Sequence, residues 1–424
     1  MRISFLTNIL TPYRIHFFDE IFSQLTKTGG KISVFVMTDE LPLRPWKYDD
    51  LKREYTHLLK GKRVDIGAND YLYNRTVVKD ILDFKPDVLI VAGSWTYPTV
   101  WKTVFSSKIK QQCPVLFWTE SHDHTGLPNA SKTKPVIKVV KRFILEQFDG
   151  FCLPGKYAIE NIAQYIDTRK AQIVRLPNLV DNEYYSYARE MRKYRTELRE
   201  KNDIRNDVKV FFTPARMVEL KGQLPFLLNA ANVLNGKNVM FVFAGEGPDK
   251  IRIQEIAEQI GVNVRLLDYQ NQEQIREWEA LSDAFLLPSI SDANPLTNIE
   301  AAWAGLPLCI SCYVGNGPEL VDEYSNGVIF DTLNKEDVEQ KMLFILKQND
   351  EWFARAGEIS YKKAQADFEV HSEVEKFIIE LTNRIIRGGY SLKVNENVIL
   401  CKALLCLETV WYKKIEFIQT LVMG

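Results

Sequence analysis

Two carboxylates, Asp292 and Glu300, stand eight positions apart in the most informative segment of the chain. An apolar run at 284–288 precedes them, and a second apolar run at 308–311 follows. This pattern predicts a strand, a loop, a helix and another strand, with the loop and the helix N-terminus at the carboxyl end of a parallel sheet. Free backbone N–H groups at such a place bind anions, most commonly phosphate. The segment therefore predicts a site for a phosphorylated ligand that is rich in hydroxyl groups.

Three further loops carry groups that suit the same ligand. Arg216 and Lys221 follow an apolar run and stand five positions apart, a spacing that suits two cations on one diphosphate. Gly245 and Glu246 belong to a glycine-rich turn, where the backbone can approach a ligand closely. The loop 314–319 follows another apolar run. All these runs are expected to be strands of one sheet, so the loops are expected to lie along the same edge.

The elements that must position these loops are visible as apolar runs that alternate with amphipathic segments. This alternation is typical of parallel sheets with helices on both faces. In the first half we expect strands at 3–6, 32–37, 88–91, 115–118, 151–153 and 173–176, and helices at 13–25 and 136–147. In the second half we expect strands at 208–212, 239–244, 264–267, 285–287, 308–311 and 328–330. The charge-dense segment 181–207 separates the halves, which predicts two doubly wound domains that face each other across a cleft.

Length and composition agree with a soluble two-domain protein. The chain has 424 residues, of which 46% are hydrophobic and 26% are charged, and its formal net charge is −1. A net charge near zero gives no general attraction for nucleic acid. Most of the six cysteines lie in apolar runs, as reduced thiols of a cytoplasmic protein do. A membrane-spanning helix is not expected from the sequence.

Together the motifs resemble those of the retaining glycosyltransferases of family 4 (glycosyl transferases group 1), which have the GT-B fold. The motifs are Arg216-x4-Lys221-Gly222, Ala244-Gly-Glu-Gly-Pro, Pro288-Ser-x-x-Asp292-x7-Glu300-Ala-x3-Gly-x-Pro and Gly315-x-x-Pro-Glu319. In the first half, the segments 86–91 and 176–181 are similar to family segments. The resemblance covers about residues 1–385. It implies an acceptor-side Rossmann-like domain at 1–185 and a nucleotide-sugar-binding Rossmann-like domain at 186–385.

The same resemblance implies a nucleotide-diphosphate-sugar donor that is bound mainly by the second domain. Arg216 and Lys221 would hold the diphosphate, Glu300 the ribose hydroxyls, and Asp292 the sugar. The implied donor-binding residues are Gly245, Glu246, Ala293, Asn294, Leu296, Thr297 and Glu300. Preorganised cations suit this role because charge develops on the departing diphosphate. The sequence has no Asp-x-Asp triplet for a metal, so we expect catalysis without a metal and without a cofactor.

This chain also departs from the family pattern. Asp292 stands where the family usually has Glu, one methylene longer. The opening loop lacks the paired glycines common in the family, and Tyr13 and Arg14 are expected to shape the acceptor side instead. Many members carry a His near the reacting sugar, and Glu120 falls at that position, with His122 two residues further. We prefer Glu120 as the cleft residue and therefore expect it to act with Arg216, Lys221 and Asp292, whereas His122 belongs to the acceptor side or to a surface loop.

The tail at 386–424 is apolar and helical in pattern. It is expected either to pack on the body or on a second subunit, or to contact a membrane surface through Trp411, Tyr412, Lys413 and Lys414. The second alternative would place the protein peripherally on the cytoplasmic face of a membrane.

The sequence thus predicts a glycosyltransferase that moves a sugar to an acceptor hydroxyl with retention, in polysaccharide or glycolipid biosynthesis. The acceptor would be a glycan or a lipid-linked molecule. A nucleotide-sugar epimerase of similar fold is an alternative, which would need two acid/base groups and no acceptor pocket. A catalytically silent nucleotide-sugar-binding partner of another transferase is the other alternative, because a fold alone does not guarantee activity.

Overall fold

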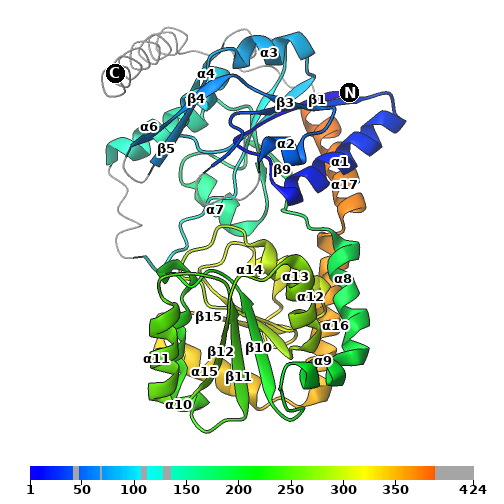
Figure 1. Ribbon diagram of the computed structural model, residues 1–424. Coiled ribbons are helices and arrows are strands. Elements are labelled where there is room, and N and C mark those ends of the chain that lie inside the picture. Colours follow the sequence, from blue (N-terminus) through cyan, green and yellow to red (C-terminus); the bar gives the residue numbers. More distant parts are fainter. Residues whose placement is uncertain (42–46, 67–68, 107–111, 128–134, 387–424) are drawn as a thin grey trace, which may run out of the picture.

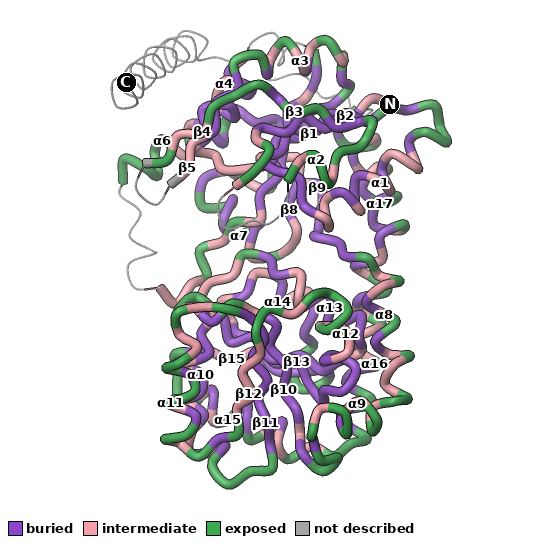
Figure 2. Tube along the Cα trace, in the orientation of Figure 1, coloured by how far each residue is buried: buried purple, intermediate pink, exposed green. Residues whose placement is uncertain are grey.

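The structure is a computed structural model that describes residues 1–41, 47–66, 69–106, 112–127 and 135–386. Two parallel sheets, one in each half of the chain, form the centres of two domains (Figure 1). The Cα trace is buried along both sheets and exposed mainly in the surrounding helices and loops (Figure 2). The mixed α/β architecture that the alternating sequence pattern predicts is therefore confirmed.

The first sheet has the strand order β3-β2-β1-β6-β7-β8-β9, and its neighbouring strands in the described residues pair in parallel. These strands are β1 (Arg2–Thr7), β2 (Lys31–Val36), β3 (Thr56–Leu58), β6 (Val88–Ala92), β7 (Val115–Trp118), β8 (Gly150–Leu153) and β9 (Gln172–Arg175). The accompanying helices are α1 (Pro12–Lys27), α2 (Tyr48–Leu51), α3 (Val77–Phe84), α4 (Pro98–Phe105), α6 (Pro135–Leu145) and α7 (Lys156–Ala163). A separate antiparallel pair consists of β4 (Gly61–Ile66) and β5 (Asn69–Asn74).

The second sheet has the order β12-β11-β10-β13-β14-β15, again with parallel pairing in the described residues. Its strands are β10 (Lys209–Pro214), β11 (Val239–Ala244), β12 (Asn263–Leu267), β13 (Ala284–Leu287), β14 (Leu308–Ser311) and β15 (Gly327–Phe330). Its helices are α10 (Gln223–Leu234), α11 (Lys250–Ile260), α12 (Gln272–Leu281), α13 (Leu296–Trp303), α14 (Gly317–Leu320), α15 (Lys335–Leu346) and α16 (Asp350–Asp367), with a 3-10 turn η2 (Glu219–Lys221). In both sheets the order reverses direction beside the first strand, which is where doubly wound folds bind ligands.

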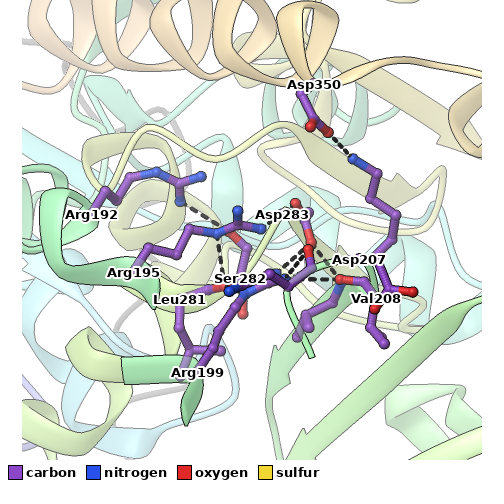
Figure 3. Close-up of polar contacts among 12 residues, drawn as sticks. Arg192, Arg195, Arg199, Asp207, Val208, Leu281, Ser282, Asp283 and Asp350 are labelled. Atoms are coloured by element: carbon purple, nitrogen blue, oxygen red, sulfur yellow. Dashed lines mark hydrogen bonds and ion pairs between the residues drawn. The ribbon is translucent and has the colours of Figure 1, made fainter. Parts of the chain in front are cut away.

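The segment between the sheets is helical. It consists of α8 (Asn182–Met191), the 3-10 turn η1 (Arg192–Tyr194) and α9 (Arg195–Lys201). Arg192, Arg195 and Arg199 all donate hydrogen bonds to carbonyl oxygens at the C-terminal end of α12. Arg195 and Arg199 also pair with Asp283, immediately before β13 (Figure 3). Cations stabilise a helix C-terminus, so this part of the charged linker is anchored to the second domain.

The chain returns to the first domain near its described end. After α16, the helix α17 (Val370–Leu381) packs against α1 and β9, and η3 (Thr382–Ile386) follows it (Figure 1). Phe377 lies 6.0 Å from Phe17 and 6.5 Å from Phe5 between ring centroids. Glu373 forms an ion pair with Arg175 at the end of β9. Residues in the range predicted for the second domain, 186–385, thus complete the core of the first.

The apolar tail and its membrane-contact residues, predicted at 386–424, lie outside the described residues except for Ile386. Within the described residues, no helix has the length and apolar character needed to cross a membrane. Cys309 and Cys312 are free thiols at β14, and Cys113 and Cys152 are buried.

Candidate active site

The loops at the carboxyl ends of the two sheets meet one another. The backbone N–H of Gly126, from the loop after β7, donates to the carbonyl of Ile290 after β13 at 2.8 Å. The N–H of Lys156, after β8, donates to the Glu319 carboxylate at 2.6 Å. The side-chain amide of Asn178, after β9, donates to the carbonyl of Asn294 at 3.2 Å. The two domains therefore join at the sheet edges where the sequence places its candidate residues.

Lys221 and Asp292 form an ion pair at this junction. Both side chains are mostly buried, with 21% of the lysine and 16% of the aspartate side chain exposed. Lys221 ends η2, and Gly222 follows it with a φ of +68°. A Cβ on Gly222 would lie 2.0 Å from the carbonyl oxygen of Pro288, so this turn requires glycine. The close approach of the two loops brings the ammonium group to the carboxylate.

The backbone of Asp292 is held from both domains. Its carbonyl oxygen accepts a hydrogen bond from the N–H of Gly315 at 2.9 Å and lies 2.9 Å from Nε2 of His122. A Cβ on Gly315 would lie 1.6 Å from the carbonyl oxygen of Ala293, so a larger residue would displace this loop. Ala293 itself is exposed. The backbone of Asp292 is thus held in place by loops from both domains.

Arg216 lies on the neighbouring loop with an exposed side chain. Its guanidinium makes no hydrogen bond or ion pair within the described residues, although its carbonyl accepts one from Gln223. The glycine-rich turn rests directly on this loop, since a Cβ on Gly245 would lie 2.6 Å from the carbonyl oxygen of Ala215. Glu246 is exposed, and its side chain accepts from the N–H of Tyr269 at 3.3 Å. Arg216 is therefore free to turn toward a bound anion.

Arg14 and Glu120 approach from the first domain. Arg14 donates to Thr7 at 2.6 Å, and its guanidinium lies 4.8 Å above the ring of Trp118. Its Nη2 is 3.7 Å from Oε1 of Glu120. Tyr13, whose ring lies 5.9 Å from the same guanidinium, is half-buried at the start of α1. These residues form a compact polar group on the acceptor side of the predicted cleft.

Glu120 has an oxygen with unused hydrogen-bonding capacity. Its Oε1 is buried and has no hydrogen-bond partner among the described residues. Burial raises the pKa of Glu120; Arg14 opposes this rise, and the negative charge of Asp292 adds to it. His122 differs, because its Nδ1 accepts from the N–H of His124 at 3.1 Å while its Nε2 faces the Asp292 carbonyl. Burial also lowers the pKa of His122. The structure thus leaves Glu120, and not His122, with an open acceptor.

Helix α13 places the rest of the carboxylate motif. Pro295 is its N-cap and provides no side-chain cap, so the N–H groups of Leu296 and Thr297 at the first turn are not capped by a side chain. Just before it, Asn294 is buried and its Nδ2 has no partner among the described residues. One helical turn further, Glu300 is 8% exposed. The N-terminus of α13 and the carboxylate of Glu300 therefore belong to the same short helix.

Glu300 belongs to a buried acidic group that the sequence analysis did not predict. Burial raises the pKa of Glu300 to about 7, and a hydrogen bond from Tyr185 opposes this rise. Glu279 on α12 is fully buried, and neither of its carboxylate oxygens has a partner among the described residues. Burial and the charge of Glu300 raise the pKa of Glu279. No spacing signal links these residues, because they come from α8, α12 and α13.

The described residues contain no group of three or more His, Cys, Asp or Glu side chains that could hold a metal ion. The charged groups that the structure brings together are Arg14, Glu120, Lys221 and Asp292, with Arg216 on the adjacent loop. Opposed cations and carboxylates of this kind suit a ligand with both phosphate and hydroxyl groups.

Comparison with known proteins agrees with this geometry. The sequence model of the family described as glycosyl transferases group 1 matches residues 194–363, which include Arg216, Lys221, Asp292 and Glu300. Residues 194–363 belong to this family. The resemblance on which the site residues were predicted is thereby confirmed for the group 1 region of the chain.

Two named relatives are similar to part of this sequence. N-acetyl-alpha-D-glucosaminyl L-malate synthase of Bacillus anthracis is 22% identical over 243 residues, which is 57% of this chain and 62% of the relative. The putative glycosyltransferase EpsF of Bacillus subtilis is 28% identical over 182 residues, which is 42% of this chain and 46% of that protein. The chain thus spans less than two thirds of the length of either relative.

Solved structures confirm the GT-B fold of this chain. A glycosyltransferase of Rickettsia africae matches with a TM-score of 0.68 at 14% identity, covering 92% of this chain and 99% of that chain. HepE of Anabaena, solved in complex with UDP, matches with a TM-score of 0.67 at 14% identity, covering 90% of this chain and all of that chain.

Proposed function

We propose that this protein is a glycosyltransferase that moves a sugar from a nucleotide-diphosphate-sugar donor to an acceptor hydroxyl, with retention and without a metal. The observation that carries the proposal is the meeting of Lys221 and Asp292 with Glu120 and Arg14 at the junction of the two sheets. The family match and the fold support the reaction class.

The donor would lie on the second domain. Lys221 and Arg216 would bind the diphosphate, Lys221 by exchanging its carboxylate partner for phosphate oxygens and Arg216 by turning inward. The uncapped N-terminus of α13 would add backbone N–H groups and a favourable dipole. Glu300, one turn along the same helix, would accept hydrogen bonds from the ribose hydroxyls. The structure of HepE in complex with UDP-glucose supports a nucleotide-sugar donor for a protein of this fold.

The transfer would need little covalent chemistry from the protein. The bond between the anomeric carbon and the diphosphate oxygen breaks, and a bond from the acceptor oxygen to the same face of that carbon forms. The acceptor proton passes to the departing diphosphate, which carries the electrons of the broken bond. Lys221 and Arg216 would stabilise the charge on that leaving group, and such electrostatic stabilisation is usually the largest catalytic contribution.

Glu120 would orient the sugar or the acceptor from the opposite domain. Its buried oxygen without a hydrogen-bond partner can accept from a hydroxyl, and the nearby Arg14 keeps part of its negative charge balanced. Asp292, after Lys221 engages the diphosphate, would be free to bind sugar hydroxyls. Because Asp is one methylene shorter than Glu, Asp292 would hold the sugar hydroxyls deeper in the site.

The acceptor is proposed to be a growing polysaccharide or a lipid-linked molecule. Among the relatives are a Vi polysaccharide biosynthesis protein of Salmonella typhi and alpha-monoglucosyldiacylglycerol synthase of Acholeplasma laidlawii, which support these two classes. The predicted cytoplasmic location stays a prediction.

A thermal-shift screen against UDP-, GDP- and dTDP-sugars tests the donor assignment, because a ligand that binds the folded state raises the melting temperature. With the donor identified, nucleoside diphosphate should be released only when an acceptor is added, and release should persist in excess EDTA. Interconversion of the donor sugar without any acceptor would instead identify an epimerase. Donor binding with no turnover on any acceptor fraction would identify a silent binding partner.

A further inference from the structure

A cavity of about 450 Å³ opens on the second domain beside the linker helices α8 and α9. Its lining includes three arginines of the linker, Arg189, Arg192 and Arg195, together with Asp283. Asp283 immediately precedes β13, whereas Asp292 belongs to the loop that follows the same strand. The two ends of a strand lie at opposite edges of its sheet, so this cavity is separate from the proposed donor site. Cavities of roughly 300–1,000 Å³ hold small organic ligands.

The carboxylates around the cavity already have cationic partners. The four in its lining are Glu190, Asp283, Asp350 and Glu358, and each forms an ion pair with at least one Lys or Arg side chain. Asp283 is shared by two arginines, Arg195 and the buried Arg199 (Figure 3). Arg192 forms no ion pair within the described residues. The cavity therefore keeps a surplus of positive charge at Arg192 and Arg195.

Both of these guanidinium groups keep donors for a ligand. Arg192 donates through Nη1 to the carbonyls of Glu279 and Ser282 at 3.3 and 3.0 Å, and its Nε and Nη2 have no partner in the described part of the chain. Arg195 donates through Nε and Nη2, which leaves its Nη1 without a partner among the same residues. Burial and, after it, the charge of Arg195 lower the pKa of Arg192 to about 10, and Asp283 opposes this effect only in part. A bound anion would relieve this repulsion between cations.

We propose that this cavity binds the phosphate group of a small phosphate monoester, held between the guanidinium groups of Arg192 and Arg195. The oxygens of a phosphate point in several directions, so two guanidinium groups from different positions can share it, whereas a planar carboxylate matches one. Phe353 and Ala354 of α16 also line the cavity and provide an apolar wall for the organic part. Since the cavity lies across the sheet from the proposed donor site, the ligand would be an effector of the protein and not its donor.

Isothermal titration calorimetry of the full-length protein with glycerol 3-phosphate, at constant ionic strength, tests the proposal. We expect saturable binding, and weaker binding of inorganic phosphate, which has no organic part to contact the apolar wall. Arg192→Met should weaken binding of glycerol 3-phosphate at least about tenfold, because a charge-assisted hydrogen bond is lost.

A second variant leaves every arginine in place. Ala354 is exposed in α16, so Ala354→Glu should fold normally while it adds a carboxylate that competes with the ligand for Arg192 and Arg195. It should also weaken binding at least about tenfold. The matched controls are Arg355→Met and Ala366→Glu, which make the same two changes at exposed positions of α16 outside the cavity lining. Both should bind as the wild type does.

One further variant distinguishes this cavity from the proposed donor site, which would also bind phosphate groups. Lys221→Ala should leave the affinity for glycerol 3-phosphate unchanged, and loss of binding in this variant would place the ligand in the donor site and overturn the proposal. Absence of saturable binding by the wild type would overturn it, as would undiminished binding by both Arg192→Met and Ala354→Glu. Equal or tighter binding of inorganic phosphate would refute the monoester assignment, and tighter binding of malonate would refute the phosphate assignment.

Discussion

At the scale of single residues, the charge on Lys221 should dominate the transfer step. The lysine is held beside Asp292 by a turn that requires glycine, so its ammonium group is already positioned where charge develops on a diphosphate. Replacing it, Lys221→Ala, should lower kcat by about 10²–10³-fold, the usual cost of removing one preorganised charge-stabilising group. Steady-state rates with the identified donor and acceptor measure this.

A lysine outside the site provides the comparison. Lys237 is exposed after α10, and Lys237→Ala should leave both kcat and KM unchanged. If Lys221→Ala turned over within about twofold of the wild type, Lys221 would have no role in transition-state stabilisation.

Glu300 should make the stability of the protein depend on pH. Burial raises its pKa from 4.5 to about 7, so between these values the folded protein binds a proton that the unfolded chain has lost. The free energy of unfolding must therefore fall as the pH rises through this window, by about 3 kcal/mol in total. Glu300→Gln cannot ionise and should lose less stability than the wild type between about pH 5 and pH 8. Melting temperatures of the wild type and of Glu300→Gln, measured between about pH 5 and pH 8, test this prediction. The prediction would be contradicted if the melting temperatures of the two proteins changed with pH by the same amount.

The candidate residues could be predicted from sequence only where a motif fixed their order. Lys221, Asp292 and Glu300 are such residues, because short loops on neighbouring strands must converge at one edge. Glu279 and Tyr185 could not be found in this way. Each stands in a helix with many charged residues, and its burial beside Glu300 depends on how three separate helices pack.

At the scale of elements, the linker α8–α9 depends on one buried cation. Arg199 is 0% exposed and donates to Asp283 and to carbonyls near the start of β10 and the end of α12 (Figure 3). Arg199→Met should destabilise the protein by about 3–5 kcal/mol, because it removes the buried ion-pair partner of Asp283 and the donor to the carbonyl of Val208. Chemical denaturation gives the free energy of unfolding.

An exposed arginine in the same region is the control. Arg205 pairs with Asp207, and these side chains are 72% and 62% exposed. Arg205→Ala should cost less than about 1 kcal/mol, since exposed ion pairs contribute little. Equal losses in the two variants would contradict the view that burial of Arg199 sets its importance.

The elements of the two sheets were predictable because buried parallel strands read as short continuous apolar runs. Each strand expected from such a run is present, with bounds shifted by at most two residues. Three described strands were not expected, namely β3, β4 and β5. The run Gly-Lys-Arg-Val-Asp-Ile of β4 is mostly polar, so its pairing depends on the hairpin and not on a buried face.

At the scale of the whole molecule, the chain crosses between the domains twice, and its second crossing could not be read from the sequence. The pattern of α17 predicts an amphipathic helix, but it does not say which domain covers the apolar face. The aromatic cluster of Phe5, Phe17 and Phe377 settles this, because its members come from opposite ends of the described chain. The two ends of the described chain are therefore joined by packing in the first domain, while the loops around Asp292 join the two domains.

This arrangement predicts that a change in α17 weakens the first domain. Phe377 is 2% exposed, and Phe377→Ala should lower the free energy of unfolding by about 3–5 kcal/mol through the lost burial and the cavity left behind. Because α17 packs on α1, hydrogen exchange should accelerate at the amides of α1 in this variant, although α1 lies more than three hundred residues earlier in the chain. Ile379→Ala, in the same helix but at a side chain that is 52% exposed, should cost less than about 1 kcal/mol and leave α1 protected. Unchanged exchange in α1 after Phe377→Ala would mean that the first domain is stable without the returning helix.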